Sequence, residues 1–252
     1  MSRTIIITGA SGKFGRVLVE KFLKEGDSVI AIGRTKKKLE QLKSYNKNKL
    51  QYLYTICTDL MEDSAIEDVI KAIKDFGLQP DSLINNARNL EHTQLDDKGK
   101  ATSQSFLSEF KLGVVVPYQF TMSLVDAFTS SFKNIVNISS IYGSVAPNLK
   151  LYDNPLNESA IQYGVAKSAL EHLTRELSVR LAKNLVRVNC AAFGGVEGRV
   201  NEAFKKRYSE LCPSGRMLSE DEIFGPIDML LSEKTSGMTG HVMMIDGGWT
   251  IW

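Results

Sequence analysis

The sequence has few cysteines and few histidines. Cys57, Cys190 and Cys212 are odd in number, lie far apart and form no C-x-x-C pair. Such spacing predicts neither a disulfide framework nor a zinc site. The three histidines also lack the spacing of metal ligands. We therefore expect no metal site, and a reducing cytoplasm suits the chain.

Long apolar runs and an excess of one charge are also missing. No stretch approaches the roughly eighteen apolar residues of a membrane span, and the first apolar run, Thr4 to Thr8, is too short for a signal peptide core. A formal net charge of +2 does not indicate a nucleic-acid partner. Repeats and low-complexity linkers are absent, so residues 1–252 are expected to form a single domain.

Short apolar runs alternate with amphipathic helical patterns along the chain. They predict strands at residues 3–8, 28–33, 52–57, 82–85, 134–138, 186–191 and 242–245. Helices are predicted from Phe14 onwards, at 63–76, at 103–131 with a break or kink at Pro117, and at 160–183. This alternation is typical of an α/β fold with a parallel, doubly wound sheet of about seven strands flanked by helices.

Two irregular segments interrupt the alternation, one at residues 142–159 and one at residues 193–222. Both follow predicted strands. Open α/β sheets bind their ligands at the carboxyl ends of the strands. The two segments are therefore expected to form the walls of a substrate site.

A glycine-rich turn joins the first predicted strand to the first helix, with glycines at Gly9, Gly12 and Gly15. Between a strand and a helix, such a turn lets backbone N–H groups approach a phosphate at the positive helix end. The alternative is a tight turn with no ligand. Its place in an apparent βαβ unit at the start of the chain favours phosphate binding.

Arg34 follows the second predicted strand, and no Asp or Glu occupies residues 29 to 33. In dinucleotide-binding folds a carboxylate there binds the ribose 2′-hydroxyl, whereas an arginine accommodates a 2′-phosphate. Arg34 therefore favours NADP(H) over NAD(H). The basic run that follows, Lys36 to Lys38, has a simpler interpretation as a solvated helix start.

Tyr163 and Lys167 lie four residues apart in a predicted helix and so share one face. At 4 Å and an effective dielectric constant of 20, an ammonium attracts a phenolate by about 4 kcal/mol. Lys167 would thus favour the phenolate and make Tyr163 a proton donor near neutral pH. The same spacing also occurs by chance on amphipathic helices, so the pair alone is weak support for catalysis.

Several short motifs occur in a characteristic order. They are Thr8-Gly9 through Gly15, Asp59-Leu60, Asn85-Asn86-Ala87, Asn137-Ile138-Ser139-Ser140, Tyr163-x-x-x-Lys167, Arg187-Val188-Asn189 and Asp246-Gly247-Gly248. Together they resemble the short-chain dehydrogenase/reductase family over essentially the whole chain. The resemblance implies a Rossmann-type fold and an NAD(P)-dependent oxidoreductase.

The resemblance also implies roles for particular residues. Tyr163 would exchange a proton with the substrate oxygen, Lys167 would support Tyr163 and bind the nicotinamide ribose, and Ser140 would hydrogen-bond the reacting carbonyl or alcohol. Because neighbouring strand residues point to opposite sides, only one of the two serines at 139 and 140 can face the site. The implied cofactor-binding residues are Gly9, Ser11, Gly12, Phe14, Gly15, Arg34, Asp59, Leu60, Asn86, Ala87, Tyr163, Lys167, Gly194 and Val196.

The chain departs from the family pattern at several positions. The glycines of the turn are displaced by one, so that Lys13 is either a phosphate contact or a surface lysine. Arg88 replaces the glycine after Asn-Asn-Ala, Gly113 falls where many members have a catalytic asparagine, and Phe193 replaces a proline before Gly194. These differences concern proton relay and the nicotinamide loop rather than cofactor binding.

Ser140 and Tyr163 are 23 positions apart, more than in compact family members. With the Trp249 to Trp252 ending, this resembles members encoded with bacterial surface-polysaccharide and flagellin-glycan biosynthesis. It implies a sugar or nucleotide-linked sugar as substrate. Candidate phosphate contacts are Arg88, Arg199, Lys205, Lys206, Arg207 and Arg216, although residues 205–207 also suit a solvated basic helix.

Two other functions remain open. A reductase of 3-oxoacyl thioesters is common for this fold, although the polar residues Asp153, Asn154 and Asn157 argue against an acyl chain. The departures at Gly113 and Phe193 also allow an NADP(H)-binding sensor or structural protein without turnover. The apolar residues Trp249, Ile251 and Trp252 are expected to be buried against the body or a neighbouring subunit of a homodimer or homotetramer.

Overall fold

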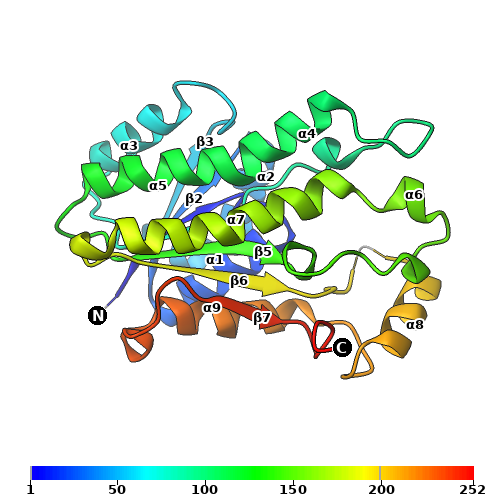
Figure 1. Cartoon of the computed structure of the whole chain (residues 1–252). Helices are drawn as coiled ribbons and strands as arrows, with labels where there is room; N and C mark the ends of the chain where they lie inside the picture. The colour runs from blue at the N-terminus through cyan, green and yellow to red at the C-terminus, as the bar shows by residue number, and fades with distance from the viewer. Residues whose placement is uncertain (1, 199) are drawn as a thin grey trace.

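A computed structural model describes residues 2–198 and 200–252 (Figure 1). Seven parallel strands form one sheet in the order β3-β2-β1-β4-β5-β6-β7. The predicted doubly wound α/β fold is therefore confirmed. The strands are β1 (Thr4–Thr8), β2 (Ser28–Gly33), β3 (Leu53–Cys57), β4 (Ser82–Asn85), β5 (Asn134–Ser140), β6 (Arg187–Phe193) and β7 (Val242–Ile245).

Helices cover both faces of the sheet (Figure 1). They are α1 (Lys13–Glu25), α2 (Lys36–Tyr45), α3 (Ala65–Asp75), α4 (Ser103–Phe110), α5 (Val116–Ala127), α6 (Pro155–Glu158), α7 (Ile161–Arg180), α8 (Glu202–Leu211) and α9 (Phe224–Leu231). Among the described residues, no helix is both long and apolar enough to cross a membrane.

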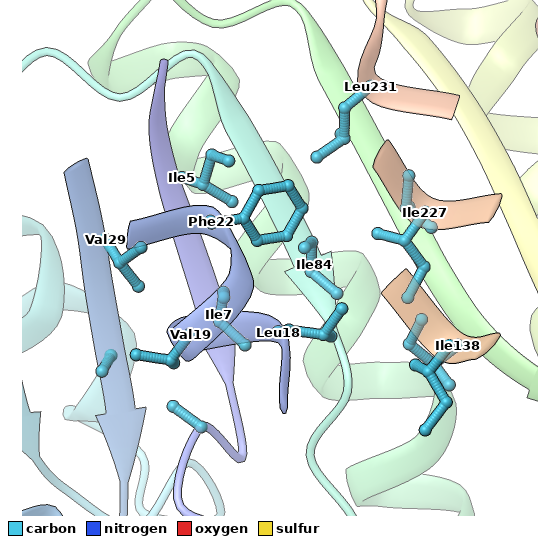
Figure 2. Close-up of a cluster of buried hydrophobic side chains, with 14 of the residues drawn as sticks. Ile5, Ile7, Leu18, Val19, Phe22, Val29, Ile84, Ile138, Ile227 and Leu231 are labelled. Atoms are coloured by element: carbon cyan, nitrogen blue, oxygen red, sulfur yellow. The ribbon is translucent and has the colours of Figure 1, made fainter. Parts of the chain in front are cut away.

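Strand β1 shows why both faces are covered. Ile5 and Ile7 join a core with α1, α2 and α9, and Figure 2 shows Phe22 of α1 among these side chains. Ile6, between them, belongs to a second core with α3, α5 and α7. Alternate residues of a strand point to opposite faces, so a continuous apolar run needs a helical layer on each side.

The helix predicted at 103–131, with a break or kink at Pro117, has a local irregularity just before the proline. The chain passes from α4 through a π-helical turn, Lys111–Val115, directly into α5. Proline lacks an N–H and its ring crowds the carbonyl four residues earlier, here that of Gly113. A local π-turn just before proline accommodates this change in hydrogen bonding while the helix continues.

The two irregular segments pack against each other at the carboxyl edge of the sheet, where α6 and α8 lie (Figure 1). Arg207 Nε of α8 donates to the Leu151 carbonyl at 2.7 Å, and its Nη1 donates to Asp153 at 2.9 Å. Tyr208 stacks on Trp249 with ring centroids 4.5 Å apart. Segments from three parts of the chain therefore form one apolar cluster beside the sheet.

Only part of the C-terminal apolar ending is buried. Trp249 is 7% exposed, whereas Ile251 and Trp252 are 76% and 80% exposed. Burial against the body of the same chain therefore applies to Trp249 and not to the last two residues. Trp249 is buried because its ring stacks on Tyr208. Ile251 and Trp252 lie beyond this contact and are exposed.

Candidate active site

The predicted site residues gather where β1 and β4 lie side by side and the strand order changes direction. The carboxyl ends of such strands are where open α/β sheets bind nucleotides. The turn after β1 and the start of α1 carry Gly9, Ser11, Gly12, Phe14 and Gly15, and the segments after β2, β3, β4 and β6 carry Arg34, Asp59, Leu60, Asn86, Ala87, Gly194 and Val196.

Two glycines of the turn are required by close packing. Gly9 has a φ of +63°, and a Cβ there would lie 2.8 Å from the Ala87 Cα. A Cβ on Gly15 would collide with the Gly9 carbonyl oxygen and with Ala10. The turn is therefore folded tightly on itself between a strand and a helix N-terminus, the kind of place where dinucleotide pyrophosphates bind.

Asn86 and Thr8 fasten this turn to the end of β4. The backbone N–H groups of Asn86 and Ala87 donate to Thr8 Oγ1 at 2.9 and 3.0 Å. Asn86 Nδ2 donates to the Thr8 carbonyl at 2.9 Å and to the Gly9 carbonyl at 3.2 Å. The Asn-Asn-Ala motif and the glycine turn thus form one hydrogen-bonded unit, and Thr8 has a larger part in it than the sequence indicated.

Arg34 is half exposed at the end of β2, as predicted from the motif. Its Nη2 donates to Asn89 Oδ1 at 3.0 Å and lies 3.9 Å from Glu91 Oε2. These partners follow β4, so they hold the guanidinium across the edge of the sheet. The geometry leaves Arg34 solvent-accessible but already paired with an acidic side chain.

The remaining cofactor candidates differ in accessibility. Asp59 Oδ1 accepts a hydrogen bond from the Met61 N–H at 3.0 Å, and Leu60 is buried in the core. Gly194 is packed against Tyr208 and Asp246. The Val196 carbonyl accepts a hydrogen bond from Lys13 Nζ at 3.2 Å. Lys13 therefore connects the start of α1 to the loop after β6.

The adjacent serines at the end of β5 have different partners. Ser139 Oγ donates to Glu171 Oε1 of α7 at 2.9 Å and is buried between strand and helix. Ser140 Oγ accepts a hydrogen bond from the Tyr142 N–H at 3.3 Å and caps the short turn that follows. Ser139 is thus committed to the interior, while Ser140 ends the strand at the sheet edge.

Lys167 ties α7 to the end of β5. It is 8% exposed, and its Nζ donates to the Ile138 carbonyl at 2.6 Å. The same Nζ lies 5.7 Å from the centroid of the Tyr163 ring. The helical spacing seen in the sequence therefore places the ammonium beside the phenol, and a buried strand carbonyl holds it there.

Arg88 provides a second cation at Tyr163. Its Cζ lies 4.1 Å from the ring centroid, within the range of a cation–π interaction. The sequence identified Arg88 as a replacement for glycine but could not place it on the tyrosine.

Glu109 of α4 is a buried acid near these groups that the sequence did not reveal. Burial raises the pKa of the Glu109 carboxyl, while the positive charges of Lys167 and Arg88 oppose the rise. His92 Nδ1 lies 4.0 Å from Glu109 Oε2 and is buried without a hydrogen-bond partner. No motif marks Glu109, because its burial arises from the packing of α4 against α7.

A small cavity lies between the sheet edge and the π-helical turn. Gly113, Lys167, Leu60 and Ala87 are among its lining residues, and it offers space for about one water molecule. A Cβ on Gly113 would meet only the Ala166 Cβ, at 3.6 Å. The glycine at the position of the usual asparagine therefore leaves room beside Lys167.

Most candidate phosphate contacts in the second irregular segment already have acidic partners. Lys205 lies 3.2 Å from Glu202, and Arg216 lies 2.7 Å from Glu222. Arg207 is paired with Asp153. Lys206 is exposed on α8, and Arg199 lies outside the described residues. Pairing with an acid does not by itself exclude a phosphate, since Arg34 is paired as well, so both interpretations of residues 205–207 stay predictions.

The fold and its carboxyl edge define a dinucleotide-binding oxidoreductase. Residues 3–209 match the family model described as short chain dehydrogenase. The chain belongs to this family of enzymes, which act on CH–OH and C=O groups with a nicotinamide cofactor. The family predicted from the motifs is thereby confirmed.

Individual relatives are distant but extend over the full length. The chain is 27% identical to post-translational flagellin modification protein A of Campylobacter coli, covering 98% of each chain. It is 26% identical to 3-oxoacyl-[acyl-carrier-protein] reductase FabG of Aquifex aeolicus, over 96% of this chain and 95% of that one. A short-chain dehydrogenase of Leptospira borgpetersenii, solved with bound NAD⁺, is 25% identical with a TM-score of 0.86, covering 99% of this chain and 93% of that one.

Proposed function

We propose that this enzyme is an NADP(H)-dependent oxidoreductase that transfers a hydride between nicotinamide and a carbonyl or secondary alcohol of a sugar derivative. The observation that carries the proposal is the position of Lys167. Its ammonium is fixed by the Ile138 carbonyl at 2.6 Å and lies beside Tyr163 at the carboxyl edge of the sheet. A lysine held in this way beside a phenol is suited to support proton transfer there.

The protein's own residues would supply position and a proton. When bound, the nicotinamide provides or accepts the hydride. Tyr163 gives its proton to the substrate oxygen during reduction and takes it back during oxidation, with Lys167 stabilising the phenolate in between. Ser140, the serine not committed to Glu171, would donate a hydrogen bond from its hydroxyl to the same oxygen and keep its proton.

Arg34 supports NADP(H) as the preferred cofactor. Its guanidinium is accessible where the ribose 2′-position is expected, and bidentate binding of phosphate is a characteristic use of arginine. Asp59 and Leu60 would flank the adenine. Asn86, Ala87, Gly194 and Val196 would line the rest of the cofactor path.

A sugar or nucleotide-linked sugar is the proposed substrate class, in surface glycan biosynthesis. The support is the flagellin modification relative together with the polar wall made by residues 142–159. Both irregular segments follow strands at the carboxyl edge of the sheet, where open α/β sheets bind their ligands, which supports a substrate enclosure there. The FabG relative supports the second candidate, reduction of 3-oxoacyl thioesters.

The test is a substrate panel of ketoses, keto-sugars, nucleotide sugars and a 3-oxoacyl thioester, assayed with NADPH and NADP⁺. Turnover of a sugar derivative is the expected result. Turnover of the thioester alone would show that the enzyme is a 3-oxoacyl thioester reductase and does not act on sugars. If the protein binds NADPH but turns over no member of the panel, the sensor function is favoured.

We also propose that the chain forms a homodimer or homotetramer in the cytoplasm. The exposed Ile251 and Trp252 are apolar surface that a second subunit would cover, and the described cysteines are all free thiols, as a reducing compartment allows. Sedimentation of the full chain and of a chain ending at Thr250 tests the assembly. The shorter chain should dissociate more readily.

A further inference from the structure

Arg88 has a position that the reaction itself does not explain. It follows Asn86 and Ala87 after the end of β4 and is exposed, and its Cζ lies 4.1 Å from the Tyr163 ring centroid. No carboxylate of the described chain lies within 4.0 Å of its guanidinium, and no described residue hydrogen-bonds to it.

Other arginines near the site are different. Arg34 is held by Asn89 and Glu91, Arg207 by Asp153, and Arg216 by Glu222. An arginine that stacks on an aromatic face keeps its N–H edge available, because stacking uses the plane and not the donors. Arg88 is therefore oriented by Tyr163 while its hydrogen-bond donors remain available.

We infer that Arg88 binds an anionic group of the substrate, a carboxylate or a phosphate, close to the reacting carbonyl or alcohol. This inference rests on the proposed function and narrows its substrate class to sugar acids, sugar phosphates or related anions. The planar guanidinium matches both groups with paired hydrogen bonds. Contact with Tyr163, which reaches the substrate oxygen, places the anion near the reacting carbon.

The surrounding charges favour an anion at this position. Lys167 adds a second cation 5.7 Å from the centroid of the same ring. Glu109, which interacts electrostatically with Lys167 and Arg88, is 3% exposed in the packing of α4. Arg88 is exposed, so an anion arriving from solvent meets its guanidinium, while the acidic side chain is buried.

The cofactor pyrophosphate could also supply an anion, but the geometry favours the substrate. The glycine turn packs against Ala87, where a Cβ on Gly9 would meet the Ala87 backbone at 2.8 Å. Arg88 is one residue further on and turns to Tyr163. Its guanidinium thus adjoins the reacting end of the site and not the turn that would hold the pyrophosphate.

The experiment compares matched neutral and anionic substrates with the full-length parent, Arg88→Met, Arg88→Lys and the control Lys206→Met. Fructose is paired with fructose 6-phosphate, and sorbitol with gluconate. A charge-assisted hydrogen bond contributes about 1.5–3 kcal/mol, which corresponds to roughly 10- to 150-fold in kcat/KM. Arg88→Met should lose this factor on the anionic substrates, mainly through KM, and Arg88→Lys should retain part of it.

The controls separate the possible causes. Lys206→Met removes one positive charge from the exposed face of α8 and should leave the discrimination intact. In Arg88→Met, kcat/KM should fall more on each anionic substrate than on its matched neutral partner, so the ratio between the two is the readout. An equal loss of kcat on every substrate would show that Arg88 acts through Tyr163 and does not bind a substrate anion. A parent enzyme that does not prefer anionic substrates would also overturn the inference.

A binding measurement extends the test beyond turnover. Calorimetry with the NADP⁺-saturated protein should show malonate or inorganic phosphate binding to the parent and about 10-fold weaker binding to Arg88→Met. If Arg88→Met instead weakens NADPH binding, the anion that Arg88 contacts is a phosphate of the cofactor. If no sugar derivative is turned over but malonate binding still depends on Arg88, the proposed substrate reaction fails while the anion site stands.

Discussion

Arg34 Nη2 donates a hydrogen bond to Asn89 Oδ1 at 3.0 Å across the edge of the sheet. The same nitrogen lies 3.9 Å from Glu91, whose side chain is 74% exposed. A ribose 2′-phosphate at Arg34 would therefore meet the negative charge of Glu91. The preference for NADPH or NADH is therefore expected to depend on Glu91, in the segment after β4, as well as on Arg34 at the end of β2.

Substitutions at Arg34 and Glu91 should change cofactor preference in opposite directions. Arg34→Ala should weaken NADPH binding about 10- to 100-fold, the range of a charge-assisted hydrogen bond, and leave NADH binding nearly unchanged. Glu91→Gln should strengthen NADPH binding, because it removes repulsion of the 2′-phosphate. Fluorescence titration measures both. Equal affinities for NADPH and NADH in the parent would contradict the role of Arg34.

Replacing Tyr163 by phenylalanine should stop proton transfer without emptying the cofactor site. Loss of a general acid lowers kcat by roughly 10²- to 10⁴-fold. The NADPH dissociation constant should stay close to that of the parent. Tyr118→Phe, at an exposed tyrosine of α5, is the matched control. A fully active Tyr163→Phe enzyme would exclude Tyr163 as proton donor.

Glu109 should make stability depend on pH. Burial raises the pKa of this carboxyl in the folded protein, so the folded state binds the proton more tightly than the unfolded state. The cost of burying the charge is absent below the unfolded pKa and grows as pH rises through the folded pKa. Glu109→Gln should therefore raise Tm at pH 8, with a difference that shrinks toward acidic pH.

Thermal unfolding at several pH values measures this effect. Each kcal/mol gained raises Tm by roughly 2–4 °C in a chain of this size. Glu210→Gln, at an exposed glutamate of α8, should show no such pH dependence. A Glu109→Gln protein that is less stable than the parent at every pH would show that the carboxylate stabilises the fold as a structural partner.

Gly15→Ala should damage both the turn and the cofactor site. A Cβ there collides with the Gly9 carbonyl and Ala10, and overpacking of this kind costs about 1–3 kcal/mol. Gly225→Ala in α9 is the control, because a Cβ at Gly225 has no neighbour within 4 Å. Denaturant titration and NADPH binding should both show a loss for Gly15→Ala only. Unchanged NADPH binding by Gly15→Ala would show that this turn does not bind the cofactor phosphates.

Much of the fold could be predicted from local patterns. Ile5, Ile6 and Ile7 form an apolar run because both faces of β1 are buried, and the structure distributes them between two cores. Gly9 and Gly15 occur where the backbone approaches itself too closely for a side chain. Such features depend on residues near in sequence, so composition and spacing were enough to indicate the sheet, its glycine turn and the helix that carries Tyr163.

Local patterns did not show how distant segments would pack. Pro117 predicted a break or kink, and the helix continues there through an adjoining π-turn. The basic residues of α8 were candidate phosphate contacts or a solvated helix face, and Arg207 is engaged by Asp153 from the other irregular segment. A sequence records that a charge is present without showing which distant acid neutralises it.

The residue types, their periodicity and the order of the motifs were sufficient to establish a doubly wound sheet and the short-chain dehydrogenase family. The surroundings of the tyrosine required the folded chain. Arg88 and Tyr163 are 75 positions apart, and Glu109 comes from a third segment. The charges of Arg88 and Glu109 act on one another only because the segment after β4, α4 and α7 pack together. Electrostatic interaction depends on distance in space and on burial rather than on position in the sequence.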